Sequence, residues 1–244
     1  MKHMDIAPEA IERIRRQTEG RYKTAREADK ALRRALRQMA GAFISPAELI
    51  KARRCMDSYI AGDKSALTQA LSLHASTRER LYDMDELYRG IFDVCPRPGS
   101  ILDLACGLNP LYLADAGFSV VGLDVHGGLV ALLNEWARAC NWDMRADCAD
   151  VLSDIPLPEC GLALMFKLLP ILERQEKGAS ARLIQRVPGR YIAITFPTRT
   201  LSGRGVGMER NYSQWFEHNC PGSHAIINRF TAAGELCYIV ERVH

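Results

Sequence analysis

The first forty residues have the apolar spacing of an amphipathic helix. Apolar side chains recur at gaps of three and four between Ile11 and Met39, and Pro8 suits a first helical turn. Gly20 marks a point where this segment can break into two pieces. Ser45-Pro46-Ala47-Glu48 has the pattern of an N-cap, a proline and a capping-box glutamate. We therefore expect helices over residues 8–40, from Pro46 to about Tyr59, and from Ser65 through Leu73.

The pattern then changes from helical to alternating. A further amphipathic helix is predicted from Thr77 through Phe92, and short apolar runs separated by helical segments follow it. We expect helical segments between the first five runs and a hairpin-like pair at the end. This order predicts an α/β fold with a mostly parallel sheet and one antiparallel strand. The predicted strands are Ser100–Cys106, Ser119–Val125, Asp143–Cys148, Cys160–Phe166, Tyr191–Phe196, His224–Phe230 and Gly234–Val243.

Composition narrows the class of protein. The chain has 244 residues, of which 48% are hydrophobic and 25% charged, a balance that argues against disorder. It shows neither an apolar run of membrane length nor the apolar stretch of a secretion signal. Its eight cysteines are irregularly spaced without a CxxC pair, which argues against a zinc site and a disulfide framework. We expect a cytoplasmic protein with reduced thiols, no membrane association and no metal.

The charge is uneven along the chain. Residues 1–75 carry 15 Lys and Arg against 9 Asp and Glu, whereas the remainder carries 17 against 20. A basic head on a mildly acidic body suggests that the head meets an anion, and RNA phosphate is a common one. A solvated helix face is the alternative explanation of such a charge run. We therefore divide the chain into a basic helical domain, residues 1–75, and a second domain, residues 76–244.

The strongest local signal is a glycine turn after the first predicted strand, Ile101 through Pro110. Gly107 allows the backbone to approach a ligand closely, at the sheet edge where α/β proteins bind ligands. The turn lacks the GxGxxG pattern of pyrophosphate binding, which favours S-adenosylmethionine (SAM) over NAD. Asp124 ends the second strand, where an acid can accept from ribose hydroxyls, and Asp150 follows the third, where it can accept from an adenine amine. Capping of turns is the alternative role for these acids.

Several blocks of the sequence resemble the 16S rRNA guanine-N7 methyltransferases that confer aminoglycoside resistance. The blocks are His74 through Leu81, Asp103 through Pro110, Phe166 through Pro170, Phe196 through Arg199, Ser202 through Gly205, and Gly207 through Glu209 with Tyr212. The resemblance covers about residues 70–244. One departure is Val206, which stands where the family pattern leads us to expect a lysine between glycines.

The resemblance implies that residues 76–244 form a Rossmann-like, SAM-binding methyltransferase domain, which methylates N7 of guanine 1405 with S-adenosylhomocysteine as product. It also implies that the helical domain, residues 1–75, docks on rRNA of the 30S subunit. It implies that Arg80 holds the SAM carboxylate, that Asp124 holds the ribose and that Asp150 and Val151 form the adenine site. The expected cofactor-binding residues are His74, Ser76, Thr77, Arg80, Asp103, Ala105, Gly107, Pro110, Asp124, Val125, Asp150, Val151 and Phe166.

The same resemblance implies where the target nucleotide lies. Lys167 and the loop from Phe196 to Gly207 would face it, and Phe166 or Phe196 would stack on an extruded base. We name Asp150, Lys167 and Phe166 as the catalytic residues. The Arg199–Arg210 stretch is expected to order only on rRNA. The expected RNA-binding residues are Arg33, Arg34, Arg37, Lys51, Arg53, Arg54, Arg199, Arg204 and Arg210.

The chemistry agrees with the lack of an evident catalytic triad. Guanine N7 carries an in-plane lone pair and no proton, so that methyl transfer to it requires alignment and no general base. The expected partner is 16S rRNA in the assembled 30S subunit, and we expect the protein to act on it as a monomer. Two alternatives stay open at this point: a SAM methyltransferase of another substrate, such as a decoding-site adenine or a small molecule, and an rRNA-binding assembly factor without turnover.

Overall fold

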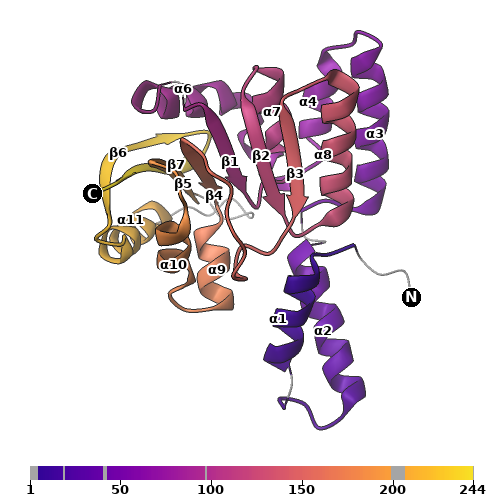
Figure 1. Cartoon of the computed structure of the whole chain (residues 1–244), viewed down its shortest axis with the longest axis vertical. Helices are drawn as coiled ribbons and strands as arrows, with labels where there is room; N and C mark the ends of the chain where they lie inside the picture. The colour runs from indigo at the N-terminus through magenta and orange to yellow at the C-terminus, as the bar shows by residue number, and fades with distance from the viewer. Residues whose placement is uncertain (1–4, 19, 41–42, 97, 199–206, 244) are drawn as a thin grey trace.

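The computed structural model describes residues 5–18, 20–40, 43–96, 98–198 and 207–243. Its centre is a seven-stranded sheet in the order β3-β2-β1-β4-β5-β7-β6 (Figure 1). Only β7 runs antiparallel to the other strands, pairing with β5 on one side and β6 on the other. The predicted α/β sheet with one antiparallel strand is thus confirmed. The strands are β1 (Ser100–Leu104), β2 (Ser119–Asp124), β3 (Met144–Cys148), β4 (Leu162–Phe166), β5 (Tyr191–Pro197), β6 (His224–Ala232) and β7 (Glu235–Arg242).

Helices cover both faces of this sheet and enclose two apolar cores. On one face, Trp136 and Leu133 of α8 and Ile91 of α6 are fully buried. On the other, Phe216 of α11 and Leu183 of α10 pack on the opposite side of the same strands. The first face carries α6 (Met84–Val94), α7 (Asn109–Asp115) and α8 (Gly127–Cys140), and the second carries α9 (Leu169–Gln175), α10 (Ala179–Arg186) and α11 (Met208–Asn219).

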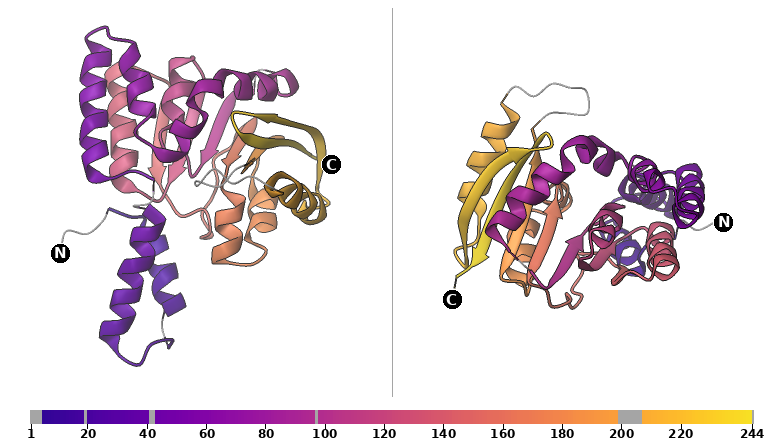
Figure 2. Two further views of the ribbon diagram at one scale, coloured as in Figure 1. Left: turned by 180° about the vertical axis from the view of Figure 1, so that it is seen from behind. Right: turned by 90° about the horizontal axis from the view of Figure 1, so that it is seen from above.

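The N-terminal helices form two distinct pairs. In the first pair, α1 (Pro8–Thr18) and α2 (Ala25–Ala40) make a hairpin that projects beyond the carboxyl ends of β2 and β3 (Figures 1 and 2). In the second pair, α3 (Pro46–Ile60) and α4 (Ser65–Leu71) pack beside α8 and α7. The predicted capping box starts α3, with the Ser45 amide donating to the Glu48 carboxylate at 2.6 Å and the Glu48 amide to Ser45 Oγ at 3.3 Å.

Two local predictions are corrected and one is confirmed. Residues 149–161, between β3 and β4, contain no helix, and Pro156 and Pro158 account for this because each removes a backbone donor. The segment expected as one helix from Thr77 through Phe92 is divided into α5 (Ala75–Arg80), a 3₁₀ turn (η1, Leu81–Asp83) and α6. The break expected at Gly20 is confirmed: residues 8–40 form two helices, with Gly20 between them at a φ of +75°. None of the described helices is long and apolar enough to cross a membrane.

Candidate functional site

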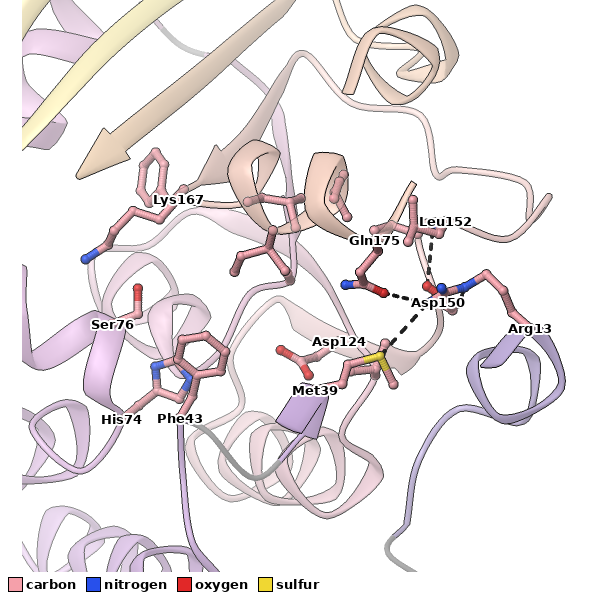
Figure 3. Close-up of a pocket in the computed structure, with 17 residues that line it drawn as sticks. Arg13, Met39, Phe43, His74, Ser76, Asp124, Asp150, Leu152, Lys167 and Gln175 are labelled. Atoms are coloured by element: carbon pink, nitrogen blue, oxygen red, sulfur yellow. Dashed lines mark hydrogen bonds and ion pairs between the residues drawn. The ribbon is translucent and has the colours of Figure 1, made fainter. Parts of the chain in front are cut away.

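A pocket opens at the carboxyl ends of β1, β2 and β4, the edge at which the sequence predicted a ligand (Figure 3). Its cavity volume is about 110 Å³, smaller than the roughly 300–1,000 Å³ typical of small-molecule sites. The lining is mostly apolar with a few acidic and basic groups. Arg13, Met39 and Phe43 contribute to it from the N-terminal helices and the segment after them, which makes the hairpin a wall of the pocket.

The glycine turn shapes one side of this pocket. Ala105 and Gly107 both have left-handed φ angles, of 55° and 54°. The Gly107 amide donates to Asp124 Oδ2 at 3.1 Å, and the His126 amide donates to Asp124 Oδ1 at 2.9 Å. A Cβ at Gly107 would lie 2.4 Å from the imidazole of His74, so the position requires glycine. Burial raises the pKa of Asp124, and the two amides oppose that shift. Two backbone amides therefore hold the Asp124 carboxylate in place at the pocket wall.

Asp150 is the other acid of the pocket, and it is almost fully buried. Its Oδ1 accepts from the Leu152 amide at 3.1 Å, and its Oδ2 accepts from Ser153 Oγ at 3.3 Å. The strongest contact is an ion pair with Arg13 of α1, whose Nε lies 2.6 Å from Oδ2 (Figure 3). The carboxylate is thus fixed from three directions at the pocket edge.

At the opposite end of the pocket, charged side chains form a buried network around Glu235. This carboxylate is 1% exposed and accepts from Arg80 Nε at 3.1 Å, Lys167 Nζ at 3.1 Å and Thr195 Oγ1 at 2.5 Å. Burial alone would raise the pKa of Glu235, but the charges of Arg80 and Lys167 and the Thr195 hydroxyl hold it below its usual value. With Glu79, which also contacts Lys167, this network holds two cations and two anions.

Lys167 connects that network to the pocket. Its Nζ also lies 2.5 Å from Glu79 Oε2, and its backbone has a φ of 54° at the end of β4. Left-handed conformations cost non-glycine residues of order 1–3 kcal/mol and are concentrated at functional sites. The Lys167 amide is anchored by the Thr195 hydroxyl and carbonyl oxygens, at 3.1 and 3.0 Å. Lys167 therefore has a fixed backbone at the pocket mouth.

His74 is a neutral base in the pocket wall. Burial first, and then the charges of Arg80 and Lys167, lower its pKa to about 3. Its Nδ1 lies 3.2 Å from Thr77 Oγ1, and its ring stacks on Phe43 with centroids 5.8 Å apart. The imidazole thus offers the pocket an uncharged polar group.

Asp103 lies behind the pocket. It is 2% exposed and accepts from Asn109 Nδ2 at 2.6 Å, while Asn109 Oδ1 accepts from the Tyr88 hydroxyl at 2.9 Å. Burial raises the pKa of Asp103 to about 7, against the Asn109 hydrogen bond and the charge of Arg80. This acid supports the glycine turn from beneath.

The structure brings most, but not all, of the predicted cofactor residues to the pocket wall. The predicted residues that line it are His74, Ser76, Ala105, Asp124, Val125, Asp150, Val151 and Phe166, together with Lys167. Five others lie one layer away and support it: Thr77, Arg80, Asp103, Gly107 and Pro110. Arg80 reaches toward the wall, because its Nη2 donates to Ser76 Oγ at 3.1 Å and its guanidinium lies 4.7 Å from the Phe166 ring centroid.

The two stacking candidates differ. Phe166 lines the pocket, whereas Phe196 is fully buried among aromatic side chains, with its ring 5.1 Å from that of Tyr212. The expectation that Phe196 can stack on a base is therefore wrong, because its ring belongs to the core between the sheet and α11.

The predicted RNA-binding residues lie on separate surfaces. Arg53 donates to both oxygens of Glu135, at 2.8 and 3.2 Å, and Arg33 is paired with Asp29. Five more are exposed on α2, α3 and the start of α11: Arg34, Arg37, Lys51, Arg54 and Arg210. Arg199, Arg204 and Val206 lie outside the described residues, so the expectation for the Arg199–Arg210 loop stays a prediction.

Sequence reasoning missed Glu235 and the hairpin side chains of the pocket. Glu235 had a signal, since it is an acid at the start of the apolar run Leu236–Val240 and directly follows Gly234. No sequence signal pointed to Arg13, because 137 positions separate it from its partner Asp150. Within the described residues, no three His, Cys, Asp or Glu side chains form a group that could hold a metal ion.

Comparison with known proteins places this geometry in context. The model of the family described as "Ribosomal RNA methyltransferase (FmrO)" matches residues 1–239. A 16S rRNA (guanine(1405)-N(7))-methyltransferase of Serratia marcescens is 40% identical over 242 residues, covering 99% of this chain and 94% of that protein. One of the same name from Micromonospora echinospora is 34% identical over 256 residues, covering 99% and 92%.

Solved structures agree. The 16S rRNA methyltransferase RmtF, crystallised with S-adenosylhomocysteine, superposes with a TM-score of 0.91 at 45% identity, covering 98% of this chain and 92% of that one. The 16S rRNA methylase RmtB gives a TM-score of 0.87 at 36% identity, also covering 98% and 92%. The pocket described above therefore lies in a fold shared with chains that methylate ribosomal RNA.

Proposed function

The chain belongs to the FmrO family of ribosomal RNA methyltransferases, and we propose that it transfers the methyl group of SAM to N7 of guanine 1405 in 16S rRNA. The full-length similarity to guanine(1405)-N7 methyltransferases, at 40% identity, carries this proposal. The pocket at the carboxyl edge of the sheet supports it independently, because it has the position and chemistry of an adenosine site.

The residues present fit SAM. A nucleoside needs acceptors for its hydroxyls and amine, and Asp124 and Asp150 provide two fixed carboxylates near the ends of adjacent strands. Val125 and Val151 add apolar surface for the adenine ring, and Ser76 and Arg80 lie at the far end, where an α-carboxylate needs donors. The cofactor supplies an electrophilic methyl carbon on a sulfonium. We assign the ribose to Asp124, the adenine amine to Asp150 and the carboxylate to Arg80.

The protein's task in the reaction is alignment. Guanine N7 is already a nucleophile, so no side chain has to remove a proton, and the attacking atom must lie about 3 Å from the methyl carbon and in line with the sulfur. Phe166 offers a ring at the pocket wall for the base, and Lys167 offers a charge held between Glu79 and Glu235 for the nucleotide's polar groups. The fixed backbone of Lys167 keeps that charge in place during the transfer.

The exposed arginines of α2 suit contact with rRNA phosphates, and we assign the hairpin this docking role on the assembled 30S subunit, as a cytoplasmic monomer. Methylation of N7 removes a major-groove acceptor and adds a positive charge. A polycationic aminoglycoside that contacts this atom then loses a hydrogen bond and meets like-charge repulsion, so we expect resistance to drugs of that kind.

The test is a methylation assay with radiolabelled SAM on intact 30S subunits and on protein-free 16S rRNA, followed by mapping of the labelled nucleotide. We expect label at N7 of guanine 1405, and more of it on 30S subunits than on bare RNA. Label on an adenine, on a different guanine or on no RNA at all would overturn the proposal. Asp124→Ala is the matched variant, and it is expected to lose both S-adenosylhomocysteine binding and methylation.

A further inference from the structure

Three arginines of α1 differ in where their side chains go. Arg15 and Arg16 bond to Glu12 of their own helix, and their side chains are 53% and 74% exposed. The Arg13 side chain instead points away from the hairpin into the cofactor pocket. There it is only 12% exposed, and the side chain of its partner Asp150 is only 3% exposed. An ion pair this buried has a cost of desolvation that good geometry must offset.

The geometry of the Arg13 contact fixes both partners. Nε donates to Asp150 Oδ2 at 2.6 Å, and Nη2 donates to Gln175 Oε1 of α9 at 3.1 Å (Figure 3). Asp150 Oδ1 accepts only from the Leu152 amide among the described residues, so this oxygen keeps a second acceptor position. Removal of Arg13 would leave Asp150 buried with no cation at hydrogen-bonding distance, and the carboxylate would lose the contact that fixes its orientation.

The hairpin is anchored to the ribose side of the pocket as well. The Ala7 amide donates to the Val125 carbonyl at 2.9 Å and the Gly127 amide to the Asp5 carbonyl at 2.7 Å, forming an antiparallel bridge around Ile6 and His126. These bonds hold the loop that directly follows Asp124. The segment before α1 therefore contacts the loop after Asp124, and Arg13 of α1 contacts Asp150 itself.

We propose that Arg13 is a positioning residue of the adenine subsite: it orients Asp150 for the adenine amine and so couples the docking hairpin to the cofactor. The inference rests on the proposed function in one respect, that the pocket takes SAM. It goes further in assigning part of cofactor recognition to the N-terminal hairpin. Because both contacts involve Asp150, a bound cofactor stabilises the hairpin in its position on the pocket. By the same linkage, the hairpin in that position raises the affinity for the cofactor.

The experiment compares two ligands and two arginines by calorimetry. The ligands are S-adenosylhomocysteine and its 6-deamino analogue, which carries hydrogen in place of the adenine amine. We expect Arg13→Ala to weaken S-adenosylhomocysteine about tenfold or more and to leave the analogue's affinity unchanged, because the lost interaction is a hydrogen bond to a charged acceptor. Arg16→Ala, on the same helix, is the matched control and is expected to change neither affinity.

The outcomes separate this inference from the proposed function. If wild-type protein binds no S-adenosylhomocysteine, the proposed function fails. If wild type binds and Arg13→Ala weakens both ligands equally, Arg13 only supports the pocket wall and the inference is overturned, as it is if neither affinity changes. Should Arg13→Ala fail to fold, Arg13→Lys keeps the test valid: one ammonium cannot reproduce the fork to Asp150 and Gln175, and an intermediate loss confined to the amine-bearing ligand is expected.

A second readout tests the coupling itself. Hydrogen exchange of the α1 amides, residues 8–18, is expected to slow when S-adenosylhomocysteine binds wild-type protein, because the ligand stabilises the Asp150 end of the ion pair. In Arg13→Ala the same saturation with ligand is expected to leave exchange in α1 unchanged. Equal protection of α1 in both proteins would contradict the coupling.

Discussion

The two halves of the basic N-terminal segment look alike in sequence and behave differently in the structure. The α3–α4 pair places Leu49, Tyr59 and Leu71 in the same apolar core as α7 and α8. Tyr59 packs on Trp136 with ring centroids 5.4 Å apart and donates its hydroxyl hydrogen bond to Asp115. Among the described side chains, the α1–α2 hairpin and the segment before it bury a small cluster of Ile6, Ala7 and Ala10, and Ile14 is also buried.

The difference shows that helical character does not define a domain. The pair α3–α4 has become part of the catalytic fold, whereas the hairpin is an appendage fixed at the pocket by an ion pair and a short bridge. The division predicted after residue 75 remains a prediction, but the packing favours a division between α2 and α3. The docking role we assign to the N-terminal region would then belong mainly to the hairpin.

The largest effect is expected from matched leucine truncations in the two halves. Leu71→Ala removes a side chain that is 2% exposed, and we expect the free energy of unfolding to fall by about 2–5 kcal/mol. Leu36→Ala removes a half-buried side chain of the hairpin's small cluster, and a loss below about 1 kcal/mol is expected. Urea denaturation followed by circular dichroism measures both. Equal losses would show that the hairpin is as integral to the fold as the pair.

A smaller effect is expected from charge changes on the two surfaces. Arg34→Glu and Arg37→Glu alter exposed side chains of α2 that have no ion-pair partner in the described part of the chain. Each is expected to weaken 30S binding, by about tenfold, and to reduce its salt dependence by about one unit of log–log slope. Arg53→Gln, on α3, should change 30S binding far less, because Glu135 already occupies Arg53.

Filter binding to 30S subunits over a range of salt concentrations measures these effects, with S-adenosylhomocysteine affinity as the check that each variant is folded. If Arg53→Gln weakens 30S binding more than the α2 variants do, the α3 face is the docking surface and the comparison between the two halves is reversed.

Sequence patterns predicted what depends on neighbours along the chain. The succession of strands, the capping box at Ser45 and the glycine turn at Gly107 are each encoded within a few residues, and the structure confirms them. The ends of successive parallel strands meet at one edge, so the joint placement of Asp124 and Asp150 also followed from topology. Those acids were found because the fold class itself specifies where they lie.

What the sequence did not predict depends on distant partners. Arg13 meets Asp150 only because the hairpin returns to the sheet edge, and Glu235 meets Arg80 across 155 positions. Phe196 was misassigned for a related reason: a strand-end aromatic is placed in the core or in the site by the helix that covers it, here α11. Periodicity carries no information about such contacts.

The smallest expected effect concerns pH and the boundary between the two halves, where His74 follows α4 and stacks on Phe43. An unfolded His74 takes up a proton near pH 6.5, whereas burial holds the folded pKa at about 3. Between these values the unfolded state binds one more proton, so acid lowers the free energy of unfolding across this window, by about 1 kcal/mol from pH 6.5 to 5.5.

His74→Gln removes this contribution, and the expected result is a flatter dependence of unfolding free energy on pH than in wild type. His218→Gln, on the exposed face of α11, is the control and is expected to leave the slope unchanged. Urea denaturation at pH 7.5, 6.5 and 5.5 gives the slope of unfolding free energy against pH for wild type and for each variant. Equal slopes for wild type and His74→Gln would contradict a neutral, buried imidazole at the pocket wall.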